Sequence, residues 1–446
     1  MTIPKRVSTA LFQSLGAGVV PRTGIEHIVV GRREEITALL GDLKAVAEGG
    51  AGFRIISGRY GAGKSFLLQL LRTHALGRNF VVADADLSPE RRLTGSGGQG
   101  LATYRELVAS LSTRARPDGG ALPAMLEKWI STISQRVVAD GTPPGDPSFD
   151  AAVETHIHAA VGELEHLVHG FDFANVIGAY WRGHRSDDDT LKTAALKWLR
   201  GEYTTKTEAR ADLGVRVIID DSTWYDHVKL LAQFVHTAGY SGLIVIIDEA
   251  VNLYKITQSV SRNSNYEKLL TMLNDSLQGR VSHLQVLIGA TPQMVEDPRR
   301  GLYSYDALRT RLETSRFAQG GLHDYAATVL RLETLSDEEV FTLLTTLRRL
   351  HALHHGYAET ITDDELAAFV NEILSRLGAD AFLTPRDVIR DFVGLLNVLR
   401  QHPGQHFLGL VQGTDFVPSR TDVVAESRRE DAERAAGSAE FAAFDL

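Results

Sequence analysis

The fold is decided by the stretch Gly58-Arg-Tyr-Gly-Ala-Gly-Lys-Ser65, which fits the pattern G-x-x-x-x-G-K-[ST]. It follows a β-rich run at 54–58 and opens a segment with helical spacing at 65–75. Glycines let the backbone N–H groups of such a loop point inward at phosphate oxygens, and the N-terminus of the helix adds positive potential. The alternative is an ordinary glycine-rich turn. The order of strand, loop and helix favours a nucleotide-binding loop.

Two side chains of this loop have expected chemical roles. Lys64 would reach the β and γ phosphates of ATP, and the hydroxyl of Ser65 would coordinate Mg²⁺. The remaining loop residues would surround the phosphates through their backbone. The expected nucleotide-binding residues here are Gly58, Arg59, Tyr60, Gly61, Ala62, Gly63, Lys64, Ser65 and Phe66.

A second element supports this interpretation. The apolar run 243–247 ends in the two acids Asp248 and Glu249. At the carboxyl end of a parallel strand beside the phosphate loop, Asp248 would hold Mg²⁺ and Glu249 would polarise the attacking water. A solvated turn at the end of a strand is the alternative. Because Glu249 is present, the sequence predicts an enzyme that hydrolyses ATP.

Strand-like and helical segments alternate along the chain up to about residue 290. Apolar runs at 80–83, 243–247 and 284–290 indicate further strands, and helical spacing lies between them. This alternation predicts an α/β fold with a parallel sheet covered on both faces. The largely helical stretch 116–238 is too long for a simple connection between strands, so we expect an inserted helical subdomain there.

Composition limits the function classes. The 446 residues contain no cysteine, which excludes disulfides, zinc knuckles, iron–sulfur ligation and thiol catalysis. There are 47 basic and 56 acidic residues, a net charge of -9, which argues against a binder held mainly by a polybasic surface. The longest purely aliphatic run is 243–247, so we expect no membrane span and a cytoplasmic protein.

Further segments, in this order along the chain, resemble the AAA+ ATPase superfamily. The run 29–35 (VVGRREE) is similar to the box that lines the adenine pocket, which adds Val30 and Gly31 to the binding residues. The strand 284–290 is closed by Thr291, at the position of the sensor-1 residue. The run 383–387 (LTPRD) resembles the start of the sensor-2 helix, so the resemblance implies that Arg386 meets the γ-phosphate.

The same resemblance implies a domain plan. It consists of a three-layer core with a parallel sheet, the helical insertion and a C-terminal helical lid. The junction into the lid is similar to 332–339 (LETLSDEE). The expected boundaries are 1–24 for an N-terminal segment, 25–330 for the ATPase core, 331–411 for the lid and 412–446 for a flexible tail.

An arginine that acts on a neighbouring subunit would lie between sensor 1 and the lid. The segment 303–317 offers Arg309, Arg311 and Arg316. Arg311 is preferred because Leu-x-x-Arg-Leu resembles the family's arginine-finger position. A solvated basic helix face is the alternative. If Arg311 is a finger, the protein works as a homo-oligomer.

Segments outside the ATPase motifs resemble the BrxC/BrxD family of bacterial phage-exclusion (BREX) islands over about residues 20–410. This resemblance implies an ATP-binding protein in phage defence, with a helicase and other island proteins as partners. The segments are 86–93 (DLSPERRL), 98–107 (GQGLATYREL), 197–201 (KWLRG), 213–215 (LGV) and 239–243 (GYSGL).

Three alternatives stay open. Bases and aromatics at 181–216 could contact DNA, or could form a solvated helical surface over buried tryptophans. Bound ATP could set the assembly of a scaffold without a need for turnover. A replication-initiator or helicase-loader role is the third, although only about 35 residues follow 411, fewer than a typical added DNA-binding domain needs.

Overall fold

The computed structural model describes residues 3–165, 167–318, 322–377 and 384–413. The predicted flexible tail lies outside this part of the chain from residue 414 onward. The chain divides into two compact, discontinuous units, which are described separately below. The first unit falls within Met1–Arg32, Gly58–Gln69 and Leu332–Leu446, and the second within Arg33–Ser57 and Leu70–Arg331.

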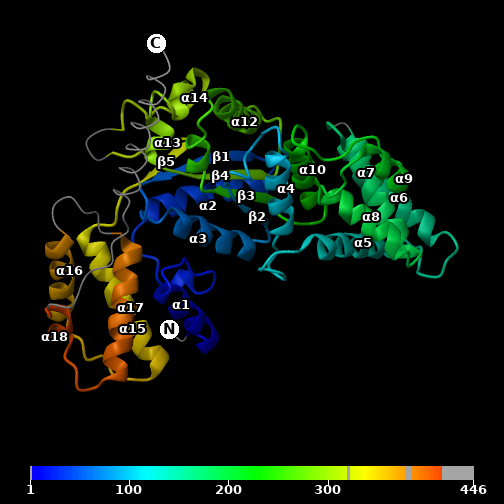
Figure 1. The fold of residues 1–446 in the computed structure, drawn as a ribbon. Helices are drawn as coiled ribbons and strands as arrows, with labels where there is room; N and C mark the ends of the chain where they lie inside the picture. Colours follow the sequence, from blue (N-terminus) through cyan, green and yellow to red (C-terminus); the bar gives the residue numbers. More distant parts are fainter. Residues whose placement is uncertain (1–2, 166, 319–321, 378–383, 414–446) are drawn as a thin grey trace, which may run out of the picture. The chain divides into compact units, whose positions relative to one another are not determined.

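The second unit is built on a five-stranded parallel sheet with the strand order β2-β3-β4-β1-β5 (Figure 1). Its central strands β3 and β4 are almost entirely buried, which explains their continuous apolar sequences. The predicted α/β fold with a parallel sheet is confirmed. The sequence pattern missed β5, because a four-residue strand gives little periodic signal. The strands are β1 (Ala51–Gly58), β2 (Val81–Asp86), β3 (Leu243–Asp248), β4 (Leu284–Ala290) and β5 (Val329–Leu332).

Helices surround this sheet, and contacts join α2 to β4, α4 to β2 and α10 to β3. Figure 1 shows a further group of helices, α5 to α9, extending beyond the β2 edge. The helices from α2 to α14 are α2 (Arg33–Ala47), α3 (Lys64–Gly77), α4 (Gln99–Ala109), α5 (Leu122–Ala139), α6 (Phe149–Glu165), α7 (Gly170–Arg185), α8 (Asp189–Leu199), α9 (Lys206–Leu213), α10 (Trp224–Thr237), α11 (Val251–Tyr254), α12 (Ser259–Leu277), α13 (Pro292–Glu296) and α14 (Asp306–Leu312).

The stretch expected to be an insertion is helical, and its last helix packs on the sheet. α10 contacts β3 and α4, so it belongs to the cover of the sheet as well as to the inserted stretch. The insertion shares one apolar core with the sheet, in which Trp129, Trp198 and Phe234 are at most 1 % exposed. Burial of these large aromatics holds the inserted helices against the sheet.

The first unit is a helical cluster together with the segment 58–69, which holds the phosphate loop and the first turns of α3. Helix α1 packs against α17 and α15, and its side chains Leu11 and Phe12 join the same apolar core as Phe392. Two of these helices begin at side-chain caps: Ser336 forms a capping box with Glu339 at the start of α15, and Thr384 caps α17. The helices are α1 (Lys5–Gly16), α15 (Asp337–His355), α16 (Asp363–Leu377), α17 (Pro385–Gln401) and α18 (Phe407–Val411).

Among the described helices, none is both long and apolar enough to cross a membrane.

Candidate functional site

The loop from Gly58 to Ser65 joins the end of β1 to the start of α3, as the motif requires. Gly61 and Gly63 have φ angles of 78° and 88°, a left-handed conformation that favours glycine. At Gly61 space is also limiting, because an added Cβ would lie 2.6 Å from the Cβ of Thr384, whereas at Gly63 the φ angle alone is restrictive. The Nζ of Lys64 donates to the carbonyl oxygens of Gly58 at 2.9 Å and Arg59 at 3.1 Å. The loop therefore holds the lysine ammonium against its own backbone.

The predicted sensor arginine lies beside this loop within the first unit. The guanidinium of Arg386 is 5.8 Å from the ring centroid of Tyr60, a cation–π arrangement. Arg386 is the second residue of α17, whose N-cap Thr384 accepts a hydrogen bond from the N–H of Asp387 at 3.2 Å. The close approach of Thr384 to Gly61 sets the start of this helix against the loop.

The predicted adenine box also meets the loop and the start of the lid. Gly31 has a φ of 65°, and an added Cβ would lie 2.1 Å from Oε1 of Glu339. The next residue, Arg32, donates from Nη2 to the carbonyl oxygens of Ala62, at 3.2 Å, and of Glu333. Sequence analysis missed Arg32, although it stands inside the quoted box. Its forked guanidinium joins three segments that are remote in sequence.

Two predicted binding residues lie against the helices of the first unit. Val30 and Phe66 are partly buried and pack on the apolar core formed by α1, α15, α16, α17 and α18. Both therefore have a packing role in the first unit, in addition to the nucleotide contacts that the sequence predicts, which are the adenine pocket for Val30 and the phosphate loop for Phe66.

In the second unit, Asp248 ends β3 and Glu249 follows it. The Oδ1 of Asp248 accepts a hydrogen bond from the N–H of Glu249 at 2.8 Å. Glu249 is exposed and has a φ of 55°, an uncommon left-handed conformation for a residue with a side chain. The next N–H, that of Ala250, donates to the carbonyl of Gly289 in β4 at 3.0 Å. Backbone bonds thus fix the turn that carries both acids.

Asp86 is an acid that sequence analysis did not single out. It ends β2 and is paired in register with Asp248 of β3. Desolvation of its carboxyl group raises the pKa of Asp86 above its ordinary value of 3.8, and the charge of Asp248 raises it further. Two carboxylates at the carboxyl ends of neighbouring strands supply oxygen donors of the kind that Mg²⁺ takes in nucleotide sites. The parallel pairing of these strands was the signal that could have identified Asp86.

Thr291 and Arg311 have other contacts in the second unit. Thr291 is the N-cap of α13, and its Oγ1 accepts a hydrogen bond from the N–H of Met294 at 3.2 Å. Arg311 is exposed on α14 and donates from Nη1 to the carbonyl of Ala307 at 2.6 Å. The neighbouring candidate Arg309 forms ion pairs with Asp306 and Glu313 on its own helix. Two nearby acids, one at the start of α14 and one just after its end, therefore balance the charge of Arg309.

The stretch 181–216 fits the second interpretation offered for it. Trp198 and Tyr203 are buried, at 1 % and 2 % exposure, and so are unable to stack on bases. Lys197 forms an ion pair with Glu208, and Lys192 forms one with Asp189. Among the described residues of this stretch, the aromatics thus form core and part of the basic charge is balanced locally.

A parallel α/β sheet in which a glycine-rich loop joins a strand to a helix with Lys-Ser at its start defines the class of P-loop-like ATP-binding proteins. Within that class the chain belongs to the BrxC/BrxD family. Residues 3–415 match the family described as BREX system ATP-binding protein BrxC/D, which confirms the resemblance found in the sequence. No curated protein matches the chain in a sequence comparison.

Proposed function

We propose that this BREX ATP-binding protein is a Mg²⁺-dependent ATPase whose turnover drives or regulates a DNA-associated phage-defence complex with helicase partners. The observation that carries the proposal is the acid pair Asp248 and Glu249 at the carboxyl end of β3, in a parallel sheet whose strand β1 leads directly into the loop 58–65. A protein that only binds ATP needs no second acid at this position.

Each residue has a role in this proposal. Lys64 carries positive charge at the mouth of the phosphate loop, and Arg386 supplies a second cation from α17. Ser65 and Asp248 would hold Mg²⁺, which would neutralise the charge that develops on the phosphates. Glu249 would accept a hydrogen bond from the attacking water and orient it, while Thr291 would supply a polar contact from β4.

The proposal includes a homo-oligomer in which Arg311 of one copy acts at the nucleotide of its neighbour. Its support is that Arg311 lies exposed on α14, while Arg309 is paired with acids on the same helix. Positive charge from outside the subunit would compensate the charge that the transition state spreads over the γ-phosphate.

The test compares Lys64→Ala with Glu249→Gln in the full-length protein. ATP binding is followed with a fluorescent ATP analogue and turnover by phosphate release. Lys64→Ala should lose ATP affinity by tenfold or more, and Glu249→Gln should keep affinity while turnover falls by about a hundredfold. Turnover should rise with protein concentration in the wild type and stay low at all concentrations in Arg311→Ala, with Arg309→Ala as the matched control.

Each part of the proposal has its own contrary result. Unchanged turnover in Glu249→Gln would refute the catalytic assignment. Full phage protection by Glu249→Gln, with its turnover abolished, would instead favour the scaffold in which bound ATP alone sets assembly. If turnover does not depend on protein concentration and Arg311→Ala leaves it unchanged, the proposed role of Arg311 at the nucleotide of a neighbouring copy would be refuted.

A further inference from the structure

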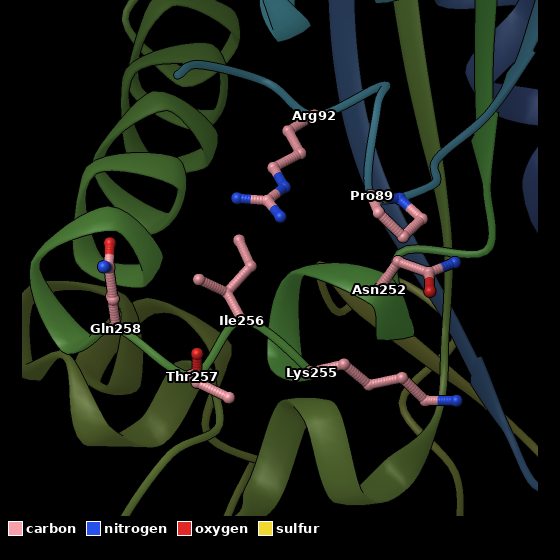
Figure 2. Close-up of a pocket in the computed structure, with 7 residues that line it drawn as sticks. All are labelled: Pro89, Arg92, Asn252, Lys255, Ile256, Thr257 and Gln258. Carbon is pink, nitrogen blue, oxygen red and sulfur yellow. The ribbon is translucent and has the colours of Figure 1, made fainter. Parts of the chain in front are cut away.

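A pocket of about 270 Å³ lies in the second unit, just beyond the carboxyl ends of β2 and β3 (Figure 2). Pro89 and Arg92, from the loop after β2, form one wall. Asn252 of α11 and the run 255–258, which leads into α12, form the other wall. The segment 86–93, on which the family resemblance partly rests and for which the ATPase motifs give no role, thus lines this pocket.

The wall that carries Arg92 is held in place by side chains from elsewhere in the unit. The Oδ1 of Asn265 accepts hydrogen bonds from the N–H groups of Leu93 at 2.9 Å and Thr94 at 3.1 Å. The carboxylate of Asp221 accepts from the N–H of Gly95 at 2.7 Å and from two further N–H groups at the start of α4. A loop anchored through its backbone presents Arg92 at a fixed position, which lowers the entropy cost of binding.

The opposite wall is surrounded by positive charge. Arg262 is only 7 % exposed and donates to the carbonyl of Ile256 at 2.8 Å, and Arg300 donates to the same carbonyl at 3.2 Å. Lys255 adds a third cation on this side. An acid also adjoins this wall: Asp297 accepts hydrogen bonds from the N–H of Arg300 and from the hydroxyl of Tyr254. Backbone hydrogen bonds lower the pKa of Asp297, so it is ionised, and the wall keeps an excess of positive charge.

Arg92 is the residue that points to a ligand. Figure 2 shows its guanidinium extending over Ile256 into the space between α12 and Pro89. Its Nε is buried, and within the described part of the chain it has no hydrogen-bond partner. The rest of the guanidinium, which extends into this space, carries further N–H donors that an anionic oxygen in the pocket can accept. The nineteen-residue helix α12 begins beside it without a side-chain cap, so its first N–H groups also favour an anion.

The surfaces next to these donors are apolar. Ile256 and Pro89 belong to the pocket lining, and Val260, two residues beyond Gln258, is 79 % exposed. A free phosphate ion would use the cations but not this apolar surface. A nucleotide unit of a longer strand matches both, because its phosphate is anionic and its sugar and base offer apolar faces.

We propose that this pocket binds a phosphodiester group of a nucleic-acid strand, with Arg92 as the anchoring cation. The site is joined to the candidate catalytic turn through Asn252, whose Nδ2 donates to the carbonyl oxygens of Leu87 at 2.9 Å and Glu249 at 3.2 Å. Strand binding would therefore alter ATP turnover by acting on the backbone of Glu249. This coupling rests on the proposed function, whereas the binding does not.

The binding test uses the full-length protein without nucleotide and a labelled single-stranded oligonucleotide, followed by fluorescence anisotropy over a salt series. Arg92→Gln should weaken binding about tenfold and reduce the slope of log affinity against log salt by about one, because one phosphate contact is lost. Arg92→Lys should restore part of the affinity. Arg210→Gln, which removes an exposed charge on α9, is the matched control and should leave binding unchanged.

Each outcome decides the proposal. Equal losses in Arg92→Gln and Arg210→Gln would overturn it, because binding would then follow net charge. Displacement of the strand by inorganic phosphate at concentrations comparable to those of the strand's phosphates would show a small-anion site and would overturn the assignment to nucleic acid. Lys64→Ala should bind the strand as the wild type does. A failure of the ATPase proposal can therefore be distinguished from a failure of the strand-binding proposal. Retained strand-dependent turnover in Arg92→Gln would reject the coupling to Glu249.

Discussion

The two units differ in how their candidate site residues are held. In the first, side chains from distant segments meet around the loop: Arg32 bonds to the carbonyls of Ala62 and Glu333, and Arg386 lies over Tyr60. In the second, the candidates follow strand ends and also serve the local backbone. Thr291, for example, caps α13. Substitutions in the first unit should therefore change mainly nucleotide binding and turnover, while the effects of substitutions in the second unit must be corrected for changes in stability.

The largest effect is expected from Arg386 in the first unit. Arg386→Ala should lower ATP turnover by about a hundredfold, because a cation that stabilises developing phosphate charge is lost. Tyr60→Ala should lower it by only about fivefold, because the arginine remains but is less well positioned, and an exposed cation–π contact is worth about 0.5–1 kcal/mol. Phosphate release at saturating ATP measures both effects.

The matched variant Tyr60→Phe keeps the aromatic face and should behave as the wild type. In the double variant, loss of Tyr60 should add nothing to loss of Arg386, since the tyrosine acts through the arginine. Fully additive losses would mean that the two residues act independently, and the contrast drawn between the units would fail for this pair.

In the second unit, substitutions of Thr291 can distinguish a structural role of this residue from a catalytic one. Thr291→Ala removes the cap of α13 and should reduce the free energy of unfolding by about 1 kcal/mol, measured by chemical denaturation. Thr291→Asp keeps a capping oxygen, so its stability should match the wild type. If Thr291 also contacts the nucleotide, turnover should fall in Thr291→Asp despite normal stability. Wild-type turnover in this variant would limit Thr291 to the cap.

The sequence alone predicted most of the sheet and the family, for identifiable reasons. β4 was predicted at its observed bounds, 284–290, because a buried central strand is a continuous apolar run. The loop 58–65 was recognised because its glycines are needed for backbone conformation. The lid contacts of Arg32 and the position of α1 among the lid helices could not be predicted, because they depend on pairings between segments some 300 residues apart. No local pattern encodes such pairings.

Asp86 was missed for the same reason, because its pairing with Asp248 joins segments far apart in the sequence. The smallest predicted effect, a change in stability, is that of a substitution at Asp86. The pKa of Asp86 is raised, so the folded protein holds this proton more tightly than the unfolded chain does. Above the raised pKa, the ionised carboxylate opposes folding, because it is partly desolvated and lies beside Asp248. Asp86→Asn should thus increase the melting temperature by about 1–2 °C near pH 7, and the gain should vanish as the pH falls below the ordinary value of 3.8.

Magnesium provides the decisive control for this last substitution. If Asp86 and Asp248 together hold Mg²⁺, Asp86→Asn should raise the Mg²⁺ concentration needed for half-maximal ATP turnover while it stabilises the metal-free protein. Asp84→Asn is unsuitable as a control for Asp86→Asn, because Asp84 forms an ion pair with Arg72. Loss of this ion pair should destabilise the fold. A gain in stability at neutral pH without any change in the Mg²⁺ requirement would leave Asp248 as the metal-binding carboxylate of the pair. The repulsion between the carboxylates of Asp86 and Asp248 would then affect stability without any role in metal binding.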